Sequence, residues 1–589
     1  MRSPPYEKKN KNKNIKERNT TMTKTLKRIV SLLITTIMIV TMGSTVFART
    51  GSFDITIVKP TDDKAEHTYT AYQIFKGDVF ENTLNGEKTL IRIEWGDHID
   101  EANFLLELQN ENPTAFGLCA DAADVAQALD NYPAYAPDFA NIATKHLKDK
   151  DTAEKAVAGS TDTEATINVT SEGYYLIVDE INQTNGNGAV SKHMLMVVDV
   201  HTADSATTPI QAKEDLPTMD KNIVDASGNK VKYNTANVGE VLTFQLDSSV
   251  PDVSEYKGYF FIVNDKLDDG FDYVGNLTVT VGGSAYTAYT ADVNGNEIKI
   301  NFIEAKTNFT GRHGDEIVIT YQAKLNEKAV RTDAGNRNTV SLTYANDPNY
   351  NYQGSNEPAL NEPTGKTPDV FTKTYTTDFS LIKIDSGTGK RLPDAEFQVT
   401  LSSTSTTQVI VETEEYALGT GSKVYYKLKD GSYTDTAPGG TIADDKYEST
   451  TDTYVLTTKT EIKNSTTGTT VTATVDSQGY LCFAGLGAGT YKLKETKAPV
   501  GYALPNDEYE ITITSSPDLN SAHWTYQVGT NAASADKIEL EIKNTMNTLP
   551  QTGGMGTTIF YVAGSVLLAA GVVLLITKKR LESNKQGEE

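Results

Sequence analysis

The chain has 589 residues and a formal net charge of −24 at pH 7, from 78 acidic and 54 basic residues. An acidic surface repels phosphate backbones, which argues against nucleic-acid binding. The two cysteines, Cys119 and Cys482, lie far apart in the sequence. This excludes a local disulfide framework and predicts two buried apolar side chains. The sequence contains no Ser/His/Asp arrangement, His/Cys metal cluster or phosphate-binding glycine loop, so we expect no turnover enzyme, no metal and no cofactor.

The N-terminal region has the pattern of an export signal. A basic segment, Met22–Arg28, is followed by an apolar segment, Ile29–Val40, and by a small-x-small triplet that ends at Ala48. This order predicts a signal peptide over residues 1–48. The polar residues 1–21 are either an upstream start or a long basic region, and in both cases they lie outside the fold.

The long region between the two hydrophobic ends has a β pattern. Short runs of alternating apolar and polar residues, such as Val241–Leu246 and Glu316–Tyr321, are separated by Gly, Asn and Asp turns. This pattern is typical of β-sandwiches. Residues 99–158 depart from it and predict short helices. We therefore expect an all-β protein of three tandem immunoglobulin-like sandwich domains, the first with short helical insertions.

Breaker residues predict the domain boundaries. The segment Thr208–Pro217 separates the first domain from the second. The Pro- and Asn-rich stretch 346–364 is interpreted as a loop, because Asp369–Tyr375 is strand-like and can close the second domain. The expected domains are residues 49–212, 213–377 and 378–548.

Polar residues lie on the apolar faces of predicted strands in the second domain. Side chains alternate along a strand, so residues two apart share a face. By this rule Lys221, Asp265 and Asn338 each share a face with apolar neighbours. The pattern directs an amine, a carboxyl and a carboxamide at one hydrophobic interior.

The third domain repeats this order with Lys383, Glu495 and Asn544. For any single case, the alternative is a strand-end residue whose polar head reaches water. Two domains with the same order and the same inward register argue against that alternative. Burial lowers a lysine pKa and raises a carboxyl pKa, which yields a neutral nucleophilic amine beside a proton-carrying acid. An amine held against an amide then forms a Lys–Asn isopeptide bond and releases ammonia, once for each site.

The C-terminal region combines three elements in order. Leu549-Pro550-Gln551-Thr552-Gly553 precedes the apolar segment Ile559–Ile576 and the basic cluster Lys578–Arg580. An apolar segment of about 20 residues spans a bilayer as a helix, and the basic cluster holds its end on the cytoplasmic side. Residues 549–589 are therefore predicted to be an anchor with an accessible pentapeptide outside the membrane.

Several of these motifs resemble a known family. Pro217–Lys221, Val263–Gly270 and Asn338–Tyr344 resemble the isopeptide-forming D2 (CnaA-like) domain of Gram-positive pilins. The segments Phe379–Asp385 and Tyr491–Tyr502 resemble a CnaB-type domain, with Glu495 at the E-box position. The first domain is similar to the N-terminal pilin domain in His67–Phe75 and Gly173–Val178. The pentapeptide Leu549–Gly553 resembles the LPXTG sorting signal.

The resemblance implies two isopeptide sets. These are Lys221–Asn338 with the acid Asp265, and Lys383–Asn544 with the acid Glu495. Asn336 is a weaker alternative to Asn338. The first domain has no late-strand asparagine of this kind, so we expect no bond there.

The resemblance also implies a covalent assembly. A class C sortase cuts between Thr552 and Gly553 and passes the threonine carboxyl to a lysine of a neighbouring subunit, or to peptidoglycan. The usual Tyr-Pro-Lys-Asn acceptor motif is absent, and Lys213 stands at the expected place. The alternative is that Lys213 is an ordinary solvated linker lysine.

Two functions are therefore compatible with these motifs. The first is the backbone subunit of a pilus on the surface of a Gram-positive bacterium, exported and anchored in the cell wall. The second is a wall-anchored adhesin, displayed singly or at a pilus tip or base, that binds a host surface ligand. Three modest domains without a large separate binding module favour the backbone subunit.

Overall fold

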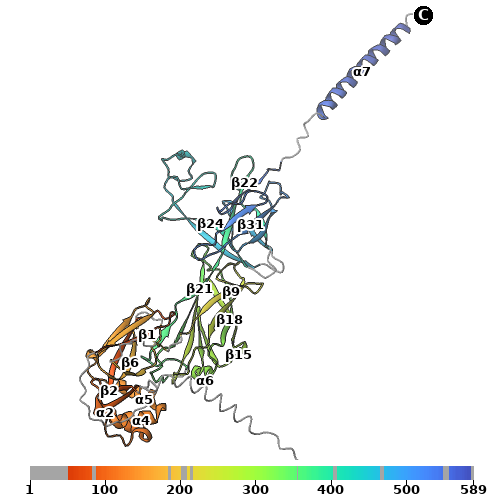
Figure 1. Ribbon diagram of the computed structural model, residues 1–589. Coiled ribbons are helices and arrows are strands. Elements are labelled where there is room, and N and C mark those ends of the chain that lie inside the picture. The colour runs from red at the N-terminus through yellow and green to blue at the C-terminus, as the bar shows by residue number, and fades with distance from the viewer. Residues whose placement is uncertain are drawn as a thin grey trace, which may run out of the picture. The chain divides into compact units, whose positions relative to one another are not determined.

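The computed structural model describes residues 51–585 apart from eight short segments (Figure 1). Those segments are residues 82–87, 183–187, 201–208, 213–215, 354–355, 402–407, 465–469 and 548–555. The predicted signal peptide, Lys213 and Leu549–Gly553 lie outside the described residues. The chain divides into two compact units, of which one contains Val241–Tyr375 and the other contains Thr376–Ser516. Strands dominate both units, which confirms the predicted all-β class.

The first domain is built on two sheets. A three-stranded sheet has the order β5-β1-β8, and a five-stranded sheet has the order β3-β2-β6-β7 with β4 also paired to β2. The strands are β1 (Phe53–Val58), β2 (His67–Glu81), β3 (Lys88–Trp95), β4 (Glu154–Ala158), β5 (Glu164–Val169), β6 (Gly173–Ile181), β7 (Met194–Val198) and β8 (Ile210–Gln211). Strand β1 alternates inward Phe53, Ile55 and Ile57 with more exposed residues, as a half-buried strand should.

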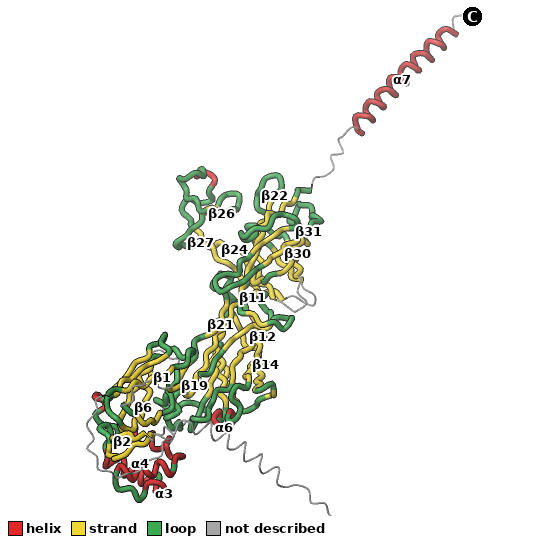
Figure 2. The backbone as a smooth tube through the Cα atoms, in the orientation of Figure 1, coloured by secondary structure: helices red, strands yellow, loops and turns green. Residues whose placement is uncertain are grey.

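The helices of the first domain gather at one end (Figure 2). They are α2 (Glu101–Glu111), α3 (Pro113–Phe116), α4 (Ala122–Asn131) and α5 (Ala136–Lys145), with 3-10 turns at Pro133–Tyr135 and Lys150–Thr152. Their apolar faces share a core with β2, β3 and β6, and Cys119 belongs to it. The predicted helical region was too long, because Glu154–Ala158 is strand β4. The residues of this segment do not by themselves specify a strand. Backbone pairing with β2 makes the segment a strand.

The second domain is a sandwich of two antiparallel-rich sheets. One has the order β10-β9-β12-β18-β14-β15 and the other β11-β21-β19-β13-β17-β16, with β20 on β19. The elements are β9 (Asp220–Val224), β10 (Lys230–Val231), β11 (Tyr233–Thr235), β12 (Val241–Ser249), β13 (Phe261–Leu267), β14 (Phe271–Val281), β15 (Ser284–Ala285), β16 (Tyr289–Asn294), β17 (Glu297–Phe302), α6 (Ala305–Phe309), β18 (Glu316–Leu325), β19 (Asn336–Ala345), β20 (Thr364–Lys366) and β21 (Val370–Tyr375). Strand β21 pairs with β19, as the strand-like pattern of Asp369–Tyr375 predicted.

The third domain is a second sandwich, with sheets of order β27-β24-β29-β22-β33 and β28-β23-β30-β31-β32. Its strands are β22 (Thr377–Asp385), β23 (Glu396–Leu401), β24 (Gln408–Leu418), β25 (Tyr426–Lys427), β26 (Tyr433–Thr434), β27 (Tyr454–Asn464), β28 (Thr470–Thr474), β29 (Tyr480–Leu486), β30 (Gly489–Lys497), β31 (Glu508–Thr514), β32 (Thr525–Val528) and β33 (Glu539–Asn544), with a 3-10 turn at Asp444–Lys446. Buried Cys482 lies on β29, and neither cysteine forms a disulfide. Both cysteines are therefore buried side chains in different domains, as predicted.

The chain ends in one long apolar helix, α7 (Gly556–Lys585). Within it, Ile559–Leu581 has a mean hydropathy of 2.6 and none of this segment is buried. Its length and composition are sufficient to cross a bilayer. This agrees with the predicted anchor.

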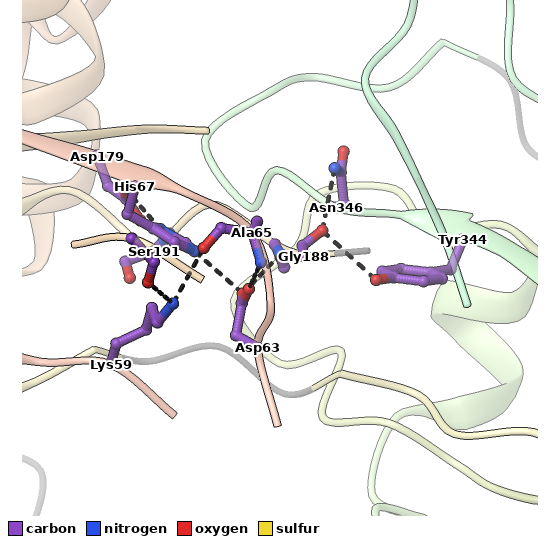
Figure 3. Close-up of polar contacts among 11 residues, drawn as sticks. Lys59, Asp63, Ala65, His67, Asp179, Gly188, Ser191, Tyr344 and Asn346 are labelled. Carbon is purple, nitrogen blue, oxygen red and sulfur yellow. Dashed lines mark hydrogen bonds and ion pairs between the residues drawn. The ribbon is translucent and has the colours of Figure 1, made fainter. Parts of the chain in front are cut away.

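A buried polar cluster organises the end of the first domain (Figure 3). The His67 ring lies between two carboxylates, with Nδ1 at 2.9 Å from Asp179 and Nε2 at 3.1 Å from Asp63. The side chains of all three residues are excluded from solvent. Each carboxylate also accepts a backbone N–H from one segment: Asp63 from Ala189, and Asp179 from Ser191. The cluster therefore fixes the segment 188–193, because buried polar groups are held in place by the hydrogen bonds that satisfy them.

The segment 188–193 also contacts a loop of the second domain. The Val190 N–H donates to the Asn346 carbonyl at 2.7 Å. The Asn346 side chain donates to the Gly188 carbonyl at 3.2 Å, and Asn349 donates to the Ser191 carbonyl at 2.9 Å. The first and second domains thus share a hydrogen-bonded junction.

We expect Asp179→Asn to destabilise the first domain by about 2 kcal/mol, because the buried His67 ring and the Ser191 N–H lose a carboxylate acceptor. Trp95 reports on this domain once the second tryptophan is removed by Trp524→Phe. Urea unfolding of the full chain in that background measures the change. The exposed Asp62→Asn is the matched control and should leave the midpoint unchanged. Equal midpoints for both variants would show that the cluster does not contribute to stability.

Candidate functional site

The second domain brings Lys221, Asp265 and Asn338 together from its two sheets. Lys221 lies on β9 in one sheet, where it pairs with Leu246 of β12. Asp265 on β13 and Asn338 on β19 lie on neighbouring antiparallel strands of the other sheet. The exposed fractions of the three residues are 0%, 2% and 0%. The alternation rule correctly placed all three in the interior between the sheets.

A fourth residue, Tyr321, connects the members of this cluster. Lys221 Nζ donates to Asp265 Oδ2 and, at 2.9 Å, to the Tyr321 hydroxyl. That hydroxyl donates to Asp265 Oδ1 at 2.9 Å, and Asn338 Nδ2 donates to it at 2.6 Å. The sequence pattern did not predict a role for Tyr321. It continues the buried alternation of β18, where only its phenol distinguishes it from the inward apolar residues.

Burial dominates the electrostatics of this cluster. Desolvation lowers the pKa of Lys221 to about 8, although Asp265 acts in the opposite direction. Desolvation also raises the pKa of Asp265, against the effect of Lys221. Lys221 Nζ lies 5.5 Å and 5.3 Å from the ring centroids of Phe244 and Tyr321. Both shifts favour a neutral amine beside a neutral acid.

The third domain holds the second cluster in a different arrangement. Lys383 on β22 and Asn544 on β33 lie on adjacent parallel strands of one sheet, and Lys383 pairs with Ile542. Glu495 reaches them from β30 in the opposite sheet. Asn544 Nδ2 donates to Glu495 Oε1 at 2.7 Å, and Lys383 Nζ lies 3.7 Å from Glu495 Oε2. The exposed fractions are 0% for Lys383, 1% for Glu495 and 2% for Asn544.

The electrostatics of this cluster follow the same rule. Desolvation lowers the pKa of Lys383 and raises that of Glu495. The side-chain carbonyl oxygens of Asn338 and Asn544 are both buried without a hydrogen-bond partner. An unpaired buried oxygen is costly, so each one needs an explanation, and these two belong to the asparagines of the two clusters.

Asn336, the alternative to Asn338, occupies a structural position. Its Nδ2 donates to the carbonyls of Val330 and Thr374, each at 3.1 Å, and its Oδ1 accepts the Val330 N–H at 2.8 Å. These bonds tie its carboxamide to the backbone. The hydrogen bonds of Lys221 are instead with Asp265 and Tyr321.

The described part of the first domain contains a buried lysine but no comparable asparagine. Lys59 is 1% exposed, and its Nζ donates to the carbonyls of Ala65 and Gly159 at 3.0 and 2.7 Å. Among the described residues of this domain, no asparagine is buried. Among all described residues of the chain, no group of three His, Cys, Asp or Glu side chains is placed to hold a metal.

Comparison with known families supports an anchored surface protein. Residues 440–527 match the SpaA family, described as a prealbumin-like fold domain. Residues 541–582 match the LPXTG cell wall anchor motif. The second match covers the end of the third domain, the pentapeptide and most of helix α7.

The chain is also similar to curated surface proteins and to a solved structure. The chain is 25% identical over 394 residues to the trypsin-resistant surface T6 protein of Streptococcus pyogenes serotype M6, covering 63% of this chain and 70% of that protein. It is 27% identical over 365 residues to fimbrial subunit type 2 of Actinomyces naeslundii, covering 59% of each. The structure of the T6 backbone pilin of S. pyogenes matches with 17% identity and a TM-score of 0.47, covering 85% of this chain and all of that one.

These findings define the protein class. The tandem sandwiches, the prealbumin-like domain and the anchor motif are those of a surface protein anchored in the cell wall of a Gram-positive bacterium. The matches to a surface protein and to a fimbrial subunit support the resemblance to pilins that the sequence motifs predicted.

We expect Asn336→Ala to destabilise the second domain by about 2 kcal/mol, because three buried or part-buried backbone groups lose their partner. Hydrogen exchange of the β19 and β21 amides in the full chain measures the change. The exposed Asn294→Ala on β16 is the control and should leave protection unchanged. Undiminished protection in Asn336→Ala would contradict the structural role.

Proposed function

We propose that the protein is a backbone pilin subunit whose second and third domains are each closed by an autocatalytic Lys–Asn isopeptide bond. The observation that carries this proposal is the repeated cluster: a buried lysine, a buried acid and a buried asparagine in each of two tandem sandwiches. A solvated lysine is protonated and unreactive, whereas these two lysines are desolvated beside an acid. The second copy of the cluster ends at Asn544, just before the pentapeptide Leu549–Gly553.

The chemistry follows from the contacts. The acid takes a proton from the lysine, which leaves a neutral amine next to the carboxamide. In the third domain a half-turn of the Asn544 carboxamide would place its oxygen at Glu495 Oε1, where a protonated carboxyl donates to it. That hydrogen bond draws electrons from the carbonyl carbon and stabilises the negative charge that develops on the oxygen. Ammonia leaves, an uncharged amide replaces the lysine amine, and the acid keeps one proton.

The bonds would strengthen the domains in different ways. In the second domain, Lys221–Asn338 joins the two sheets of the sandwich. In the third domain, Lys383–Asn544 joins the first strand to the last within one sheet. A cross-link that closes a loop of roughly 100 residues contributes on the order of 4–5 kcal/mol in the chain-entropy treatment.

The proposed assembly uses the C-terminal signal. A class C sortase cuts between Thr552 and Gly553 and transfers the Thr552 carboxyl to Lys213 of the next subunit, and finally to peptidoglycan. Helix α7 would hold the chain in the membrane until the transfer takes place. Asn544 lies on β33, close in sequence to Thr552, so the proposed third-domain bond would secure the strand that leads to the junction.

We expect the intact mass of the purified full chain to be lower by two ammonia molecules than the sequence requires. Lys383→Ala or Glu495→Gln should restore one of them and lower the resistance to heat and trypsin, because the third domain then lacks its cross-link. The exposed Lys492→Ala on β30 is the control and should keep both losses. A wild-type chain at full mass would exclude the proposed bonds.

We expect cell-wall extracts to show a ladder of high-mass species on denaturing gels. Lys213→Ala should abolish the ladder because the acceptor amine is lost, while the exposed Lys155→Ala on β4 should retain it. A single monomer band from the wild type would instead favour a wall-anchored adhesin that binds a host ligand. A ladder that persists in Lys213→Ala would assign the acceptor to another lysine.

A further inference from the structure

The Tyr321 hydroxyl contacts all three members of the second-domain cluster. It lies 2.9 Å from Lys221 Nζ and 2.6 Å from Asn338 Nδ2. It also donates to Asp265 Oδ1 at 2.9 Å. Two of these atoms are the reacting nitrogens of the proposed bond, since Nζ attacks and Nδ2 leaves. The hydroxyl therefore stands between the nucleophile and the leaving group.

The environment of Tyr321 holds this hydroxyl in place. Its ring is fully buried and stacks on Phe244, with ring centroids 5.5 Å apart. A phenol has one proton to donate and two lone pairs that accept. Here the proton is donated to Asp265, and the lone pairs face Lys221 and Asn338. The hydrogen-bonding capacity of the hydroxyl is thus fully used by the cluster, which argues against a packing role alone.

The third domain shows why the second domain needs this group. Glu495 contacts Asn544 with one carboxylate oxygen and faces Lys383 with the other. Aspartate is one methylene shorter than glutamate, and Asp265 hydrogen-bonds to Lys221 and Tyr321 but has no hydrogen bond to Asn338. In the described part of the third domain, no tyrosine hydroxyl bonds to Lys383, Glu495 or Asn544. The Tyr321 hydroxyl extends the reach of the shorter acid.

We propose that Tyr321 is a catalytic residue that relays a proton from Lys221 to the departing ammonia in the second domain. This inference rests on the proposed isopeptide bond. The relay needs a hydroxyl that touches both nitrogens, and Tyr321 is the residue that does so. No corresponding relay operates in the third domain, where Glu495 itself contacts the asparagine.

The protons balance in this scheme. Lys221 first gives one proton to Asp265 Oδ2, and the neutral Nζ then attacks Cγ of Asn338. In the tetrahedral intermediate Nδ2 gains a lone pair, so the Tyr321 proton turns from Oδ1 to Nδ2. As the Cγ–Nδ2 bond breaks, Nδ2 takes that proton and leaves as ammonia, while Tyr321 recovers a proton from Nζ. The amide keeps one N–H, Asp265 keeps one proton, and the tyrosine ends unchanged.

The protonation of Tyr321 suits this role. Burial raises the pKa of the phenol well above 10, and the adjacent Asp265 carboxylate acts in the same direction. The hydroxyl therefore keeps its proton over the whole physiological range. A group that exchanges protons with both nitrogens needs this neutral form, because a phenolate has no proton to give.

The test is Tyr321→Phe in the full chain, which removes one oxygen and retains the stacked ring. Chains are sampled at intervals after synthesis, and the two cross-linked peptides are quantified by mass spectrometry. We expect the Lys221–Asn338 bond to form at least about 100-fold more slowly, the scale of general acid–base catalysis. The Lys383–Asn544 bond in the same molecules should form at the wild-type rate. Tyr273→Phe, whose ring lies 5.9 Å from that of Tyr321, is the matched control and should form both bonds normally.

The outcomes are distinct. Normal formation of the Lys221–Asn338 bond in Tyr321→Phe overturns the relay while the proposed function stands. A wild-type chain without either bond overturns the proposed function itself. Hydrogen exchange of the β12 and β18 amides verifies the fold of the variant. A slow bond in a protected sheet supports the relay, whereas loss of protection assigns the hydroxyl to folding and overturns it.

Discussion

The structure depends on the burial of an amine and a carboxyl between two β-sheets. Lys221 with Asp265, and Lys383 with Glu495, are removed from water almost completely. Burial of two charges carries a desolvation penalty that their mutual attraction often fails to repay. A neutral pair reduces that penalty, and a covalent amide would remove it. A buried amine and carboxyl would destabilise a permanent core, but they are suited to a reaction that happens once.

The two sandwiches bury the amine and the carboxyl with different geometry. In the second domain the lysine and the asparagine lie on opposite sheets, with a short acid and a tyrosine between them. In the third domain they lie on adjacent parallel strands, and a longer acid reaches across from the other sheet. The order lysine, acid, asparagine along the chain is common to both. Different strand pairings thus create similar chemical surroundings, because only the local desolvation and the contacts of the side chains matter.

The first domain is joined to the second by non-covalent contacts. Asp63, His67 and Asp179 form a buried network that holds the segment 188–193, and this segment bonds to the second domain (Figure 3). Each buried group in that network is compensated by a hydrogen bond or an ion pair, which is the usual condition for polar groups in a core. The domain with no proposed bond is thereby joined to a neighbour for which one is proposed.

The sequence by itself determined the all-β class, the anchor and the inward faces of Lys221, Asp265, Asn338, Lys383, Glu495 and Asn544. Strand alternation has a period of two and needs no tertiary information, so a polar residue in an apolar register stands out. Tertiary structure alone decided that Glu154–Ala158 is a strand, that Asn336 is tied to the backbone, and that Tyr321 joins the cluster. The physical reason is that these outcomes depend on partners distant in sequence. A buried tyrosine looks like any core aromatic until the fold places an amine, an acid and an amide around its hydroxyl.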